Sequence, residues 1–267
     1  MIDFPNAKIN IGLNITERRA DGYHNLETVF YPLMIKDALE VIESKELNFQ
    51  SSGIVIPGSS EQNLCLKAYY LLKQDFDIKP VDIHLHKHIP IGAGLGGGSA
   101  DAAFFIKLIN QTFALGLTPD AMMQYARQLG ADCAFFINNQ PVYAYGKGDD
   151  FEPVSLDLSA YKLVLVMPPV HVSTAEAYGG IKPVPAQTSL KGLIKLPVTE
   201  WKAHIHNDFE GHIFKAHPAI AAVKDELYNA GALYASMSGS GASVFGIFEK
   251  LPDLSRLEKE NQVFYGV

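Results

Sequence analysis

The chain has 267 residues, of which 48% are hydrophobic and 19% are charged, and its formal net charge is −7. This length suggests one large or two modest domains, and the hydrophobic share is ample for a real core. An acidic chain without a block of lysine and arginine disfavours a nucleic-acid or anionic-membrane surface. We find no apolar run of about 18 residues and no export signal, so we expect a cytoplasmic protein without a membrane span.

The chain contains two cysteines, Cys65 and Cys133. They lie far apart without the spacing of a metal site, and a chain of this size does not need a disulfide to fold. We therefore expect both thiols to be reduced and buried.

The first half of the chain alternates strand-like and helix-like segments, in an α+β pattern rather than a regular βαβ pattern. The patterns predict strands over 8–16, 38–44 and 81–89, and helices over 63–74, 100–112 and 119–129. The last of these helices has clear ends, because Thr118 suits an N-cap, Pro119 suits the first turn and Gly130 closes it.

The predicted strand 81–89 alternates with period two, as a strand with one buried face does. Its apolar and polar residues occupy opposite faces: Val81, Ile83, Leu85 and Ile89 against Asp82, His84, His86 and His88. Three histidines on one face are compatible with a metal site. Because no carboxylate other than Asp82 and no cysteine lies beside them, we favour a polar face turned to solvent.

A glycine-rich loop joins this strand to the next predicted helix and is the most informative segment of the chain. Five of the seven residues over 92–98 are glycines, and the helix that follows is expected to begin at Ser99 or Ala100. Glycines let consecutive backbone N–H groups turn toward one concavity, and a helix N-terminus adds unpaired amides and the positive end of its dipole. The loop therefore predicts a phosphate-binding site.

Two common phosphate loops and a plain turn fit this segment less well. A Walker A loop ends in Gly-Lys-Ser/Thr, but here Gly98 is followed by Ser99 and not by a lysine. The spacing of a dinucleotide fingerprint is present over 92–97, but two successive predicted helices leave no place for its second strand. The nearest acid, Asp120, falls in the first turn of a helix. A plain connecting turn usually contains only one or two glycines.

The second half of the chain starts a new core after a predicted boundary over 152–159. Before it, residues 141–150 predict a strand and a glycine turn. Beyond it, the patterns predict strands over 161–167, 232–237, 243–248 and 262–266, a helix capped at Ser173 or Thr174, a helix over 218–229 and a short helix after Pro252. The proline-rich segment 181–200 is expected to be a loop. Together these elements suit a small sheet with helices on one face, in the ferredoxin-like class.

Lys8 and Asp132 are candidate catalytic residues, because a kinase needs charge neutralisation and a group that orients or deprotonates the attacking hydroxyl. Lys8 and Asn10 share one face of the first predicted strand, and Asp132 precedes an apolar segment at an expected helix start. From spacing alone both also have an ordinary interpretation. Asp132 would then be an N-cap, and Lys8 an edge residue whose stem lies on apolar surface.

Separated segments of the chain resemble the motifs of the GHMP kinases, a family that includes galactokinase, homoserine kinase and mevalonate kinase. They are 5–10 (PNAKIN) with 21–24 (DGYH), the loop over 90–103, 130–132 (GAD) and 237–245 (MSGSGASVF). The segment 21–24 resembles one branch in particular. In that branch, ATP phosphorylates the 2-hydroxyl of 4-diphosphocytidyl-2-C-methyl-D-erythritol in the non-mevalonate route to isoprenoid precursors, giving the 2-phosphate and ADP.

The resemblance implies an α+β GHMP kinase fold with two domains. Residues 1–157 would form the ribosomal-protein-S5-domain-2-like ATP-binding domain and residues 158–267 the ferredoxin-like C-terminal domain. It also implies ATP and Mg²⁺ as cofactors, a small-molecule substrate, no nucleic-acid or membrane partner, and a monomer or weak homodimer.

The resemblance further implies roles for individual residues. Asp132 would be the general base for the attacking hydroxyl or its orienting group, and Lys8 its electrostatic partner. The implied nucleotide-binding residues are Pro90, Gly92, Ala93, Gly94, Leu95, Gly96, Gly97, Gly98, Ser99, Ala100 and, near the adenine, Asn63. The implied substrate-binding residues are Asn10, Tyr23, His24, Phe30 and Tyr178. Among them, Phe30 and Tyr178 would form an aromatic sandwich on the cytosine, and Tyr23 and His24 would lie on the cytosine side, where a histidine can read a hydrogen-bonding edge. Mg²⁺ would be held through the ATP phosphates, with Ser99 as the candidate protein contact.

The sequence departs from the family pattern at a few positions. Cys133 and Ala134 stand where relatives usually have valine and proline, and Tyr178 where phenylalanine is frequent, which adds a hydroxyl that needs a partner. Other interpretations are a GHMP kinase for mevalonate, homoserine or a sugar, a nucleotide-dependent dehydrogenase, and a non-catalytic nucleotide-binding sensor. The presence of both Lys8 and Asp132 disfavours a sensor, which could lose them and still bind nucleotide.

Overall fold

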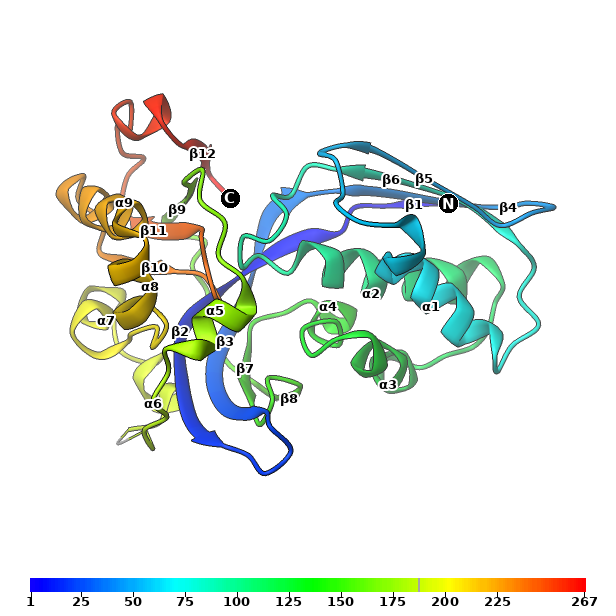
Figure 1. Ribbon diagram of the computed structural model, residues 1–267, viewed down its shortest axis with the longest axis horizontal. Coiled ribbons are helices and arrows are strands. Elements are labelled where there is room, and N and C mark those ends of the chain that lie inside the picture. Colours follow the sequence, from blue (N-terminus) through cyan, green and yellow to red (C-terminus); the bar gives the residue numbers. More distant parts are fainter. Residues whose placement is uncertain (187) are drawn as a thin grey trace. The chain divides into compact units, whose positions relative to one another are not determined.

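A computed structural model describes residues 1–186 and 188–267 (Figure 1). Contacts divide the chain into two compact units whose segments alternate along the sequence. Unit 1 comprises residues 1–8, 32–91 and 96–140, and unit 2 comprises residues 9–31, 92–95 and 141–267. The glycine-rich loop passes from one unit to the other between residues 95 and 96.

The sheet of unit 1 has the strand order β1-β4-β6-β5. Its strands are β1 (Ile2–Asp3), β4 (Ala38–Glu43), β5 (Asn48–Gly53) and β6 (Val81–Lys87). Strand β4 pairs antiparallel with β1 and β6, whereas β5 runs parallel to β6. The predicted alternation of β6 is confirmed, since Val81, Ile83 and Leu85 are buried and the intervening residues are exposed.

The polar face of β6 interacts with the neighbouring strand β5. The Ser52 hydroxyl lies 3.2 Å from Nε2 of His84 and 3.0 Å from Nδ1 of His86. These side chains are exposed, which fits the interpretation of a solvent-facing surface.

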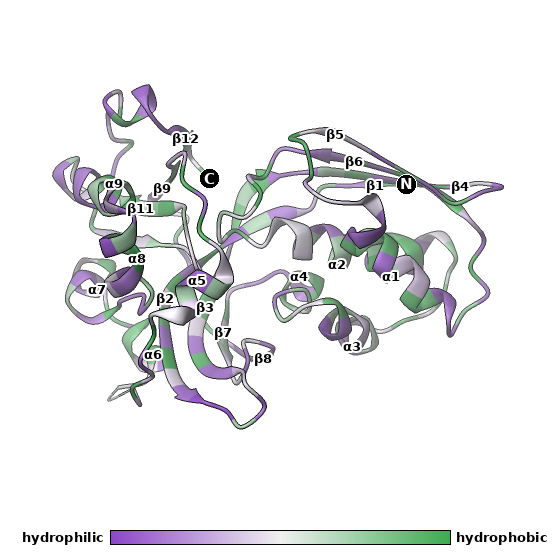
Figure 2. Cartoon of the chain, viewed as in Figure 1, coloured by the Kyte–Doolittle hydropathy of each residue, from purple (hydrophilic) through white to green (hydrophobic). Residues whose placement is uncertain are grey.

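The helices of unit 1 are α1 (Leu64–Lys73), α2 (Gly97–Thr112), α3 (Pro119–Leu129) and the short α4 (Phe135–Asn138), with a 3₁₀ turn η1 (Ser60–Gln62) before α1. Side-chain caps confirm the predicted starts of two of them, since Asn63 Oδ1 accepts from Cys65 N and Thr118 Oγ1 from Ala121 N. Helix α2 begins earlier than predicted, because Gly96 takes a left-handed conformation and Gly97 already continues as helix. The hydrophobic stretch of α2, green in Figure 2, contacts α1 and β4.

Unit 2 contains the antiparallel sheet β10-β11-β9-β12. Its strands are β9 (Lys162–Met167), β10 (Tyr234–Met237), β11 (Val244–Phe248) and β12 (Gln262–Tyr265). All four were predicted from the sequence, and β11 is buried along its whole length. Helices α5 (Thr174–Gly179), α8 (Glu210–Ala216) and α9 (Pro218–Asn229) supply apolar side chains to the same core. A 3₁₀ turn η2 (Leu257–Lys259) follows Pro252, where a short helix was predicted.

A further sheet has the order β2-β3-β7-β8. Its strands are β2 (Asn6–Arg18), β3 (His24–Lys36), β7 (Val142–Tyr145) and β8 (Asp150–Pro153). The two long strands β2 and β3 contribute residues to both units. Sequence patterns did not predict β3, because the middle of this strand is a continuous buried run rather than an alternating one.

The prediction of a loop over 181–200 was wrong in part. The segment contains α6 (Leu190–Leu193) and the first residues of α7 (Val198–His204). Ser189 caps α6, and Leu190, Val198 and Trp201 are buried, so burial stabilises helices too short for a clear periodic pattern. Position 187 of that segment lies outside the described residues.

None of the helices over residues 1–186 and 188–267 combines the length and the apolar character that a membrane crossing needs.

Candidate active site

Lys8 and Asp132 form an ion pair within unit 1. The Lys8 Nζ lies 3.3 Å from the Asp132 Oδ2, and the Lys8 side chain is 4% exposed whereas that of Asp132 is 33% exposed. Lys8 comes from β2, and Asp132 lies in the turn before α4, whose N-cap position is Ala134. The interpretation of Asp132 as an N-cap is therefore wrong, and its carboxylate faces a buried cation instead.

Gly96 allows the loop backbone to approach the Lys8 side chain closely. A Cβ at Gly96 would lie 3.1 Å from Cε of Lys8 and 3.0 Å from Cζ of Phe136. The φ angle of Gly96 is +70°, in the left-handed region. Both the tight approach and the positive φ favour glycine at this position. The close approach brings the start of α2 against the Lys8 side chain.

The start of α2 has the properties of an anion site. Its N-cap residue, Gly96, offers no side-chain acceptor, so the first backbone N–H groups of the helix have no partner from a capping side chain. A Cβ at Gly98 would meet nothing within 4 Å, which leaves open space beside the first turn. This 16-residue helix therefore presents unpaired amides and its positive dipole end to that space.

Within unit 2, residues 92–95 of the loop are held by the glycine-containing segment 237–245, which we call the second glycine motif. The Ser238 hydroxyl donates to Gly94 O at 2.9 Å, and the Ser243 hydroxyl donates to Ala93 O at 2.5 Å. A Cβ at Gly94 would lie 2.0 Å from Ser238 O, so only glycine permits this packing. The backbone N–H of Asn10 in turn donates to Ser238 Oγ at 3.3 Å.

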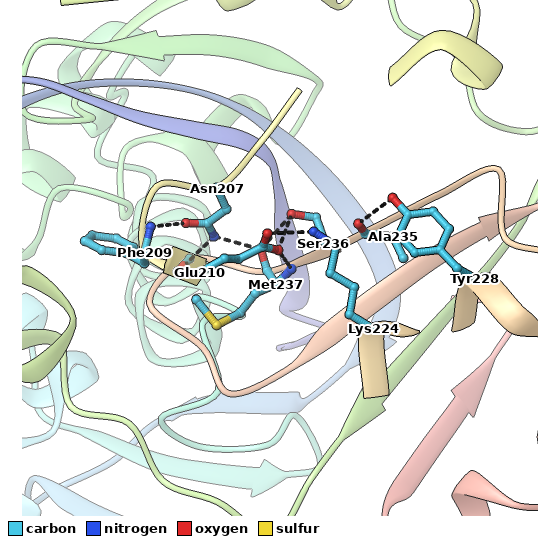
Figure 3. Close-up of polar contacts among 9 residues, drawn as sticks. Asn207, Phe209, Glu210, Lys224, Tyr228, Ala235, Ser236 and Met237 are labelled. Carbon is cyan, nitrogen blue, oxygen red and sulfur yellow. Dashed lines mark hydrogen bonds and ion pairs between the residues drawn. The ribbon is translucent and has the colours of Figure 1, made fainter. Parts of the chain in front are cut away.

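Two buried side chains fix the backbone of this second motif (Figure 3). Asn207 Nδ2 donates to the carbonyls of Met237 and Gly239 at 2.8 and 2.9 Å. Glu210 accepts from Met237 N at 2.8 Å and from the Ser236 hydroxyl at 3.2 Å, and it pairs with Lys224 at 2.6 Å. Neither Asn207 nor Glu210 stands in a recognisable motif, so neither residue could be singled out from the sequence.

The aromatic candidates for base stacking lie in unit 2. His24 and Tyr178 stack on each other, with ring centroids 5.0 Å apart and an interplanar angle of 24°, and Tyr178 also packs edge-on against Phe209 at 4.9 Å. Tyr23 is 64% exposed, with the Lys147 Nζ 5.6 Å from its ring centroid. The ring of Tyr23 is thus exposed, whereas the rings of His24 and Tyr178 stack on each other.

Of the remaining candidates, Phe30 and Asn10 have interior positions. Phe30 is 2% exposed and packs against Phe151 at 6.3 Å in an edge-on geometry. Asn10 is buried, and its Nδ2 donates to the Thr28 hydroxyl at 3.0 Å. Asn63 caps α1, as described above. The structure thus joins Lys8 with Asp132 and His24 with Tyr178 by direct contact.

Both cysteines are free and buried, as predicted. Burial raises the pKa of the Cys133 thiol to about 12, with an opposing contribution from a hydrogen bond to Ser99. Burial also raises the pKa of Cys65, and the nearby Asp101 carboxylate adds to that effect. Neither thiol is therefore a nucleophile near neutral pH.

Comparison with known proteins gives matches along the whole chain. The family model described as GHMP kinases N terminal domain matches residues 63–146, and that described as GHMP kinases C terminal matches residues 190–265. A 4-diphosphocytidyl-2-C-methyl-D-erythritol kinase of Bacteroides fragilis is 55% identical over 264 residues, covering 97% of this chain and 96% of that protein. The protein of the same name from Cytophaga hutchinsonii is 52% identical over 254 residues, covering 95% and 94%.

Solved structures are similar over the same extent. A crystal structure of 4-(cytidine 5'-diphospho)-2C-methyl-D-erythritol kinase has a TM-score of 0.86 at 29% identity, covering 100% of this chain and 98% of that one. The mevalonate kinase of Methanococcus jannaschii shares the fold, with a TM-score of 0.72 at 15% identity over 99% and 97% of the two chains. The chain belongs to the GHMP kinases and, among them, to the family of 4-diphosphocytidyl-2-C-methyl-D-erythritol kinases. The predicted α+β GHMP kinase fold is confirmed.

Proposed function

We propose that this protein phosphorylates the 2-hydroxyl of 4-diphosphocytidyl-2-C-methyl-D-erythritol with ATP, giving the 2-phosphate and ADP. The observation that carries the choice of acceptor is the 55% identity over 264 residues to the Bacteroides fragilis kinase of that name. The product would serve isoprenoid precursor synthesis, as the resemblance to this branch of the GHMP kinases implies. A kinase for mevalonate or homoserine is not favoured, because a solved mevalonate kinase and a solved homoserine kinase are only 15% and 20% identical to this chain.

For the chemical step we propose that Asp132 orients the acceptor hydroxyl and accepts its proton as the oxygen attacks the γ-phosphorus. Its partly exposed carboxylate is accessible to a substrate, whereas the buried Lys8 ammonium 3.3 Å away keeps a positive charge beside it. That charge favours the ionised carboxylate and stabilises negative charge on the attacking oxygen. Because phosphoryl transfer depends mostly on positioning, orientation is the larger part of the role.

ATP is the phosphoryl donor of a GHMP kinase, and we propose that its phosphates bind at the glycine-rich loop, residues 90–100. The open space beside Gly98 and the uncapped start of α2 support this position. Asn63, which precedes α1, would lie near the adenine. We further propose Mg²⁺ as the metal, held through the phosphates with Ser99 as the protein contact, because Mg²⁺ keeps few protein ligands in kinase sites.

We propose that the acceptor's cytosine binds in unit 2 through Tyr23, His24, Phe30 and Tyr178, with Asn10 as a further substrate contact. The support is the His24–Tyr178 stack, since an aromatic ring that already stacks on a neighbour offers the flat surface that a base needs. The phenolic hydroxyl of Tyr178 is an additional polar group at this surface.

We propose an ATP-binding domain over 1–157 and a C-terminal domain over 158–267, because the two family matches fall on either side of that boundary. We further propose a cytoplasmic enzyme, monomeric or weakly dimeric, without a nucleic-acid partner, in keeping with its net charge of −7.

The test is ATP consumption with Mg²⁺ by the purified protein, comparing 4-diphosphocytidyl-2-C-methyl-D-erythritol, mevalonate, homoserine and galactose as acceptors. We expect turnover with the cytidyl acceptor alone. Turnover with another acceptor would refute the proposed substrate and keep the fold assignment. ATP binding without turnover on any acceptor would instead indicate a nucleotide-binding sensor.

A further inference from the structure

A buried charge network lies beside the glycine-rich loop in unit 1. Its members are Asp37, Lys87 and Asp101, all at most 4% exposed. The Lys87 ammonium pairs with the Asp37 Oδ2, and it donates to the Asp101 Oδ2 at 2.7 Å. Lys87 stands at a position of β6 where the alternation places apolar residues, so a charge there breaks the pattern.

The network joins the two ends of the loop. Asp37 Oδ1 accepts from the backbone N–H groups of His88 and Ile89 at 2.6 and 2.8 Å, and these residues directly precede the loop. Asp101 belongs to α2, which leaves the loop. Lys87 therefore links, through two carboxylates, the segment that enters the loop with the helix that leaves it.

The first residue of α2 packs directly on this network. A Cβ at Gly97 would lie 2.9 Å from Cγ2 of Ile89 and 3.4 Å from Nζ of Lys87. The position of the helix start is therefore set by contact with β6 and the segment after it, with little room for displacement.

Stability alone does not explain the composition of the network. Lys87 would be neutralised by one carboxylate, yet a second is buried beside it, and Asp101 Oδ1 has no hydrogen-bond partner in the described part of the chain. Buried ion pairs are often replaceable by apolar residues without loss of stability, because removing charges from water is costly. A buried carboxylate that is not needed for neutralisation indicates a selected geometry.

We propose that Lys87, bridging Asp37 and Asp101, is a positioning residue for nucleotide binding, which fixes the start of α2 relative to the strand that enters the loop. The N–H groups of the first turn of α2 are then preorganised for phosphate oxygens before ATP arrives. This inference rests on the proposed function, in which the loop binds the ATP phosphates. None of the network residues touches a reacting atom.

The test is the dissociation constant for ATP with Mg²⁺, measured by calorimetry without acceptor, for the full chain and two variants. Lys87→Met keeps the length of the side chain and removes the bridge, and Asp101→Asn keeps the shape and replaces the carboxyl group that accepts from Lys87 by an amide. We expect Lys87→Met to weaken ATP binding about 10-fold or more, and to leave KM for the cytidyl acceptor within about 2-fold. Asp101→Asn should weaken ATP binding in the same direction by a smaller factor.

Leu85→Ala is the matched control, because Leu85 is buried on the same face of the same strand. It should lower Tm and leave the dissociation constant for ATP unchanged. The proposal is wrong if Lys87→Met binds ATP as the wild type does, or if Leu85→Ala weakens ATP binding as much. Should Lys87→Met fail to fold, Asp101→Asn decides alone, with unchanged ATP affinity overturning the proposal.

The same measurements separate this inference from the proposed function. Wild-type protein that binds ATP but does not turn over the cytidyl acceptor refutes the proposed function, and the comparison of ATP affinities still tests Lys87. Normal turnover together with wild-type ATP affinity in Lys87→Met refutes the positioning role alone.

Discussion

The ammonium of Lys8 and the carboxylate of Asp132 lie 3.3 Å apart, although 123 residues stand between them in the sequence. The two partners differ in exposure, with 4% of the lysine side chain and 33% of the aspartate side chain accessible. The lysine is thus fixed in the interior, whereas the carboxylate can reach a bound molecule. This asymmetry suits a pair in which one member handles the substrate and the other sets its charge.

Asp132→Asn should lower kcat about 100-fold or more, because the amide cannot accept the proton of the acceptor hydroxyl. KM for ATP should change little, since the loop and α2 are untouched. Steady-state kinetics with the cytidyl acceptor gives both values. Asp120→Asn, at an exposed acid in the first turn of α3, is the matched control and should retain wild-type kcat. A kcat for Asp132→Asn within a few-fold of wild type would remove Asp132 from the mechanism.

Lys8→Met should lower kcat about 10- to 100-fold while preserving the packing of the aliphatic stem. If Lys8 acts through Asp132, the two residues form one unit, and their effects are not additive. The double variant Lys8→Met with Asp132→Asn should then be no slower than the slower single variant, within about 3-fold. Multiplicative losses in the double variant would show that Lys8 acts independently of Asp132.

The local architecture was largely predictable from sequence where a segment has one buried face. The alternation of β6 and the cap at Thr118 gave the correct elements. Strand β3 was missed because its centre is buried without alternation, and α6 and α7 because they are short and stabilised by tertiary burial. Periodicity carries no signal in either situation.

The site was predictable only in part. The pairing of Lys8 with Asp132 came from a family resemblance, because the spacing of two distant residues does not determine their contact. Lys87 could have been singled out, since a lysine on the apolar face of a strand requires a buried partner. Its partners Asp37 and Asp101 could not, because only the fold brings β6, the residue between β3 and β4, and α2 together.

Gly94→Ala should destabilise the protein and weaken ATP binding. The residue has φ of +75°, and an added Cβ would lie 2.0 Å from the backbone oxygen of Ser238, which cannot move as a side-chain tip could. The left-handed conformation alone costs about 1–2 kcal/mol for a residue with a Cβ. Urea unfolding and ATP calorimetry measure the two effects. Gly192→Ala, in α6 with nothing within 4 Å of the new Cβ, is the control and should leave the protein at least as stable as the wild type.

Tyr178→Ala should raise KM for the cytidyl acceptor about 10-fold or more, because it removes the ring that stacks on His24 at 5.0 Å. Tyr178→Phe keeps the ring and should leave KM within about 2-fold, which separates stacking from the hydroxyl. Neither variant should change the dissociation constant for ATP alone. Equal KM values for wild type and Tyr178→Ala would exclude Tyr178 from the acceptor site.

Asp101 should make the stability of the protein fall as pH rises from acid to neutral. Burial, reinforced by the neighbouring Asp37 and opposed by Lys87, raises the pKa of Asp101 from its ordinary 3.8 to about 7. Between these values the folded state binds more protons than the unfolded state, so this contribution to stability is present at low pH and lost as pH approaches 7. The pKa of Lys87 is also raised, because the attraction of both carboxylates outweighs the effect of burial.

Asp101→Asn removes that pH-dependent contribution. The difference in free energy of unfolding between variant and wild type should therefore shift in favour of the variant by at least about 1 kcal/mol from pH 4.5 to pH 8. Urea unfolding at both pH values measures it. Ile83→Val, a buried and neutral change on β6, is the control, with a deficit of about 0.5–1.5 kcal/mol that does not depend on pH. A constant difference for Asp101→Asn would mean that Asp101 is ionised in the folded protein throughout this range, leaving Lys87 between two full negative charges.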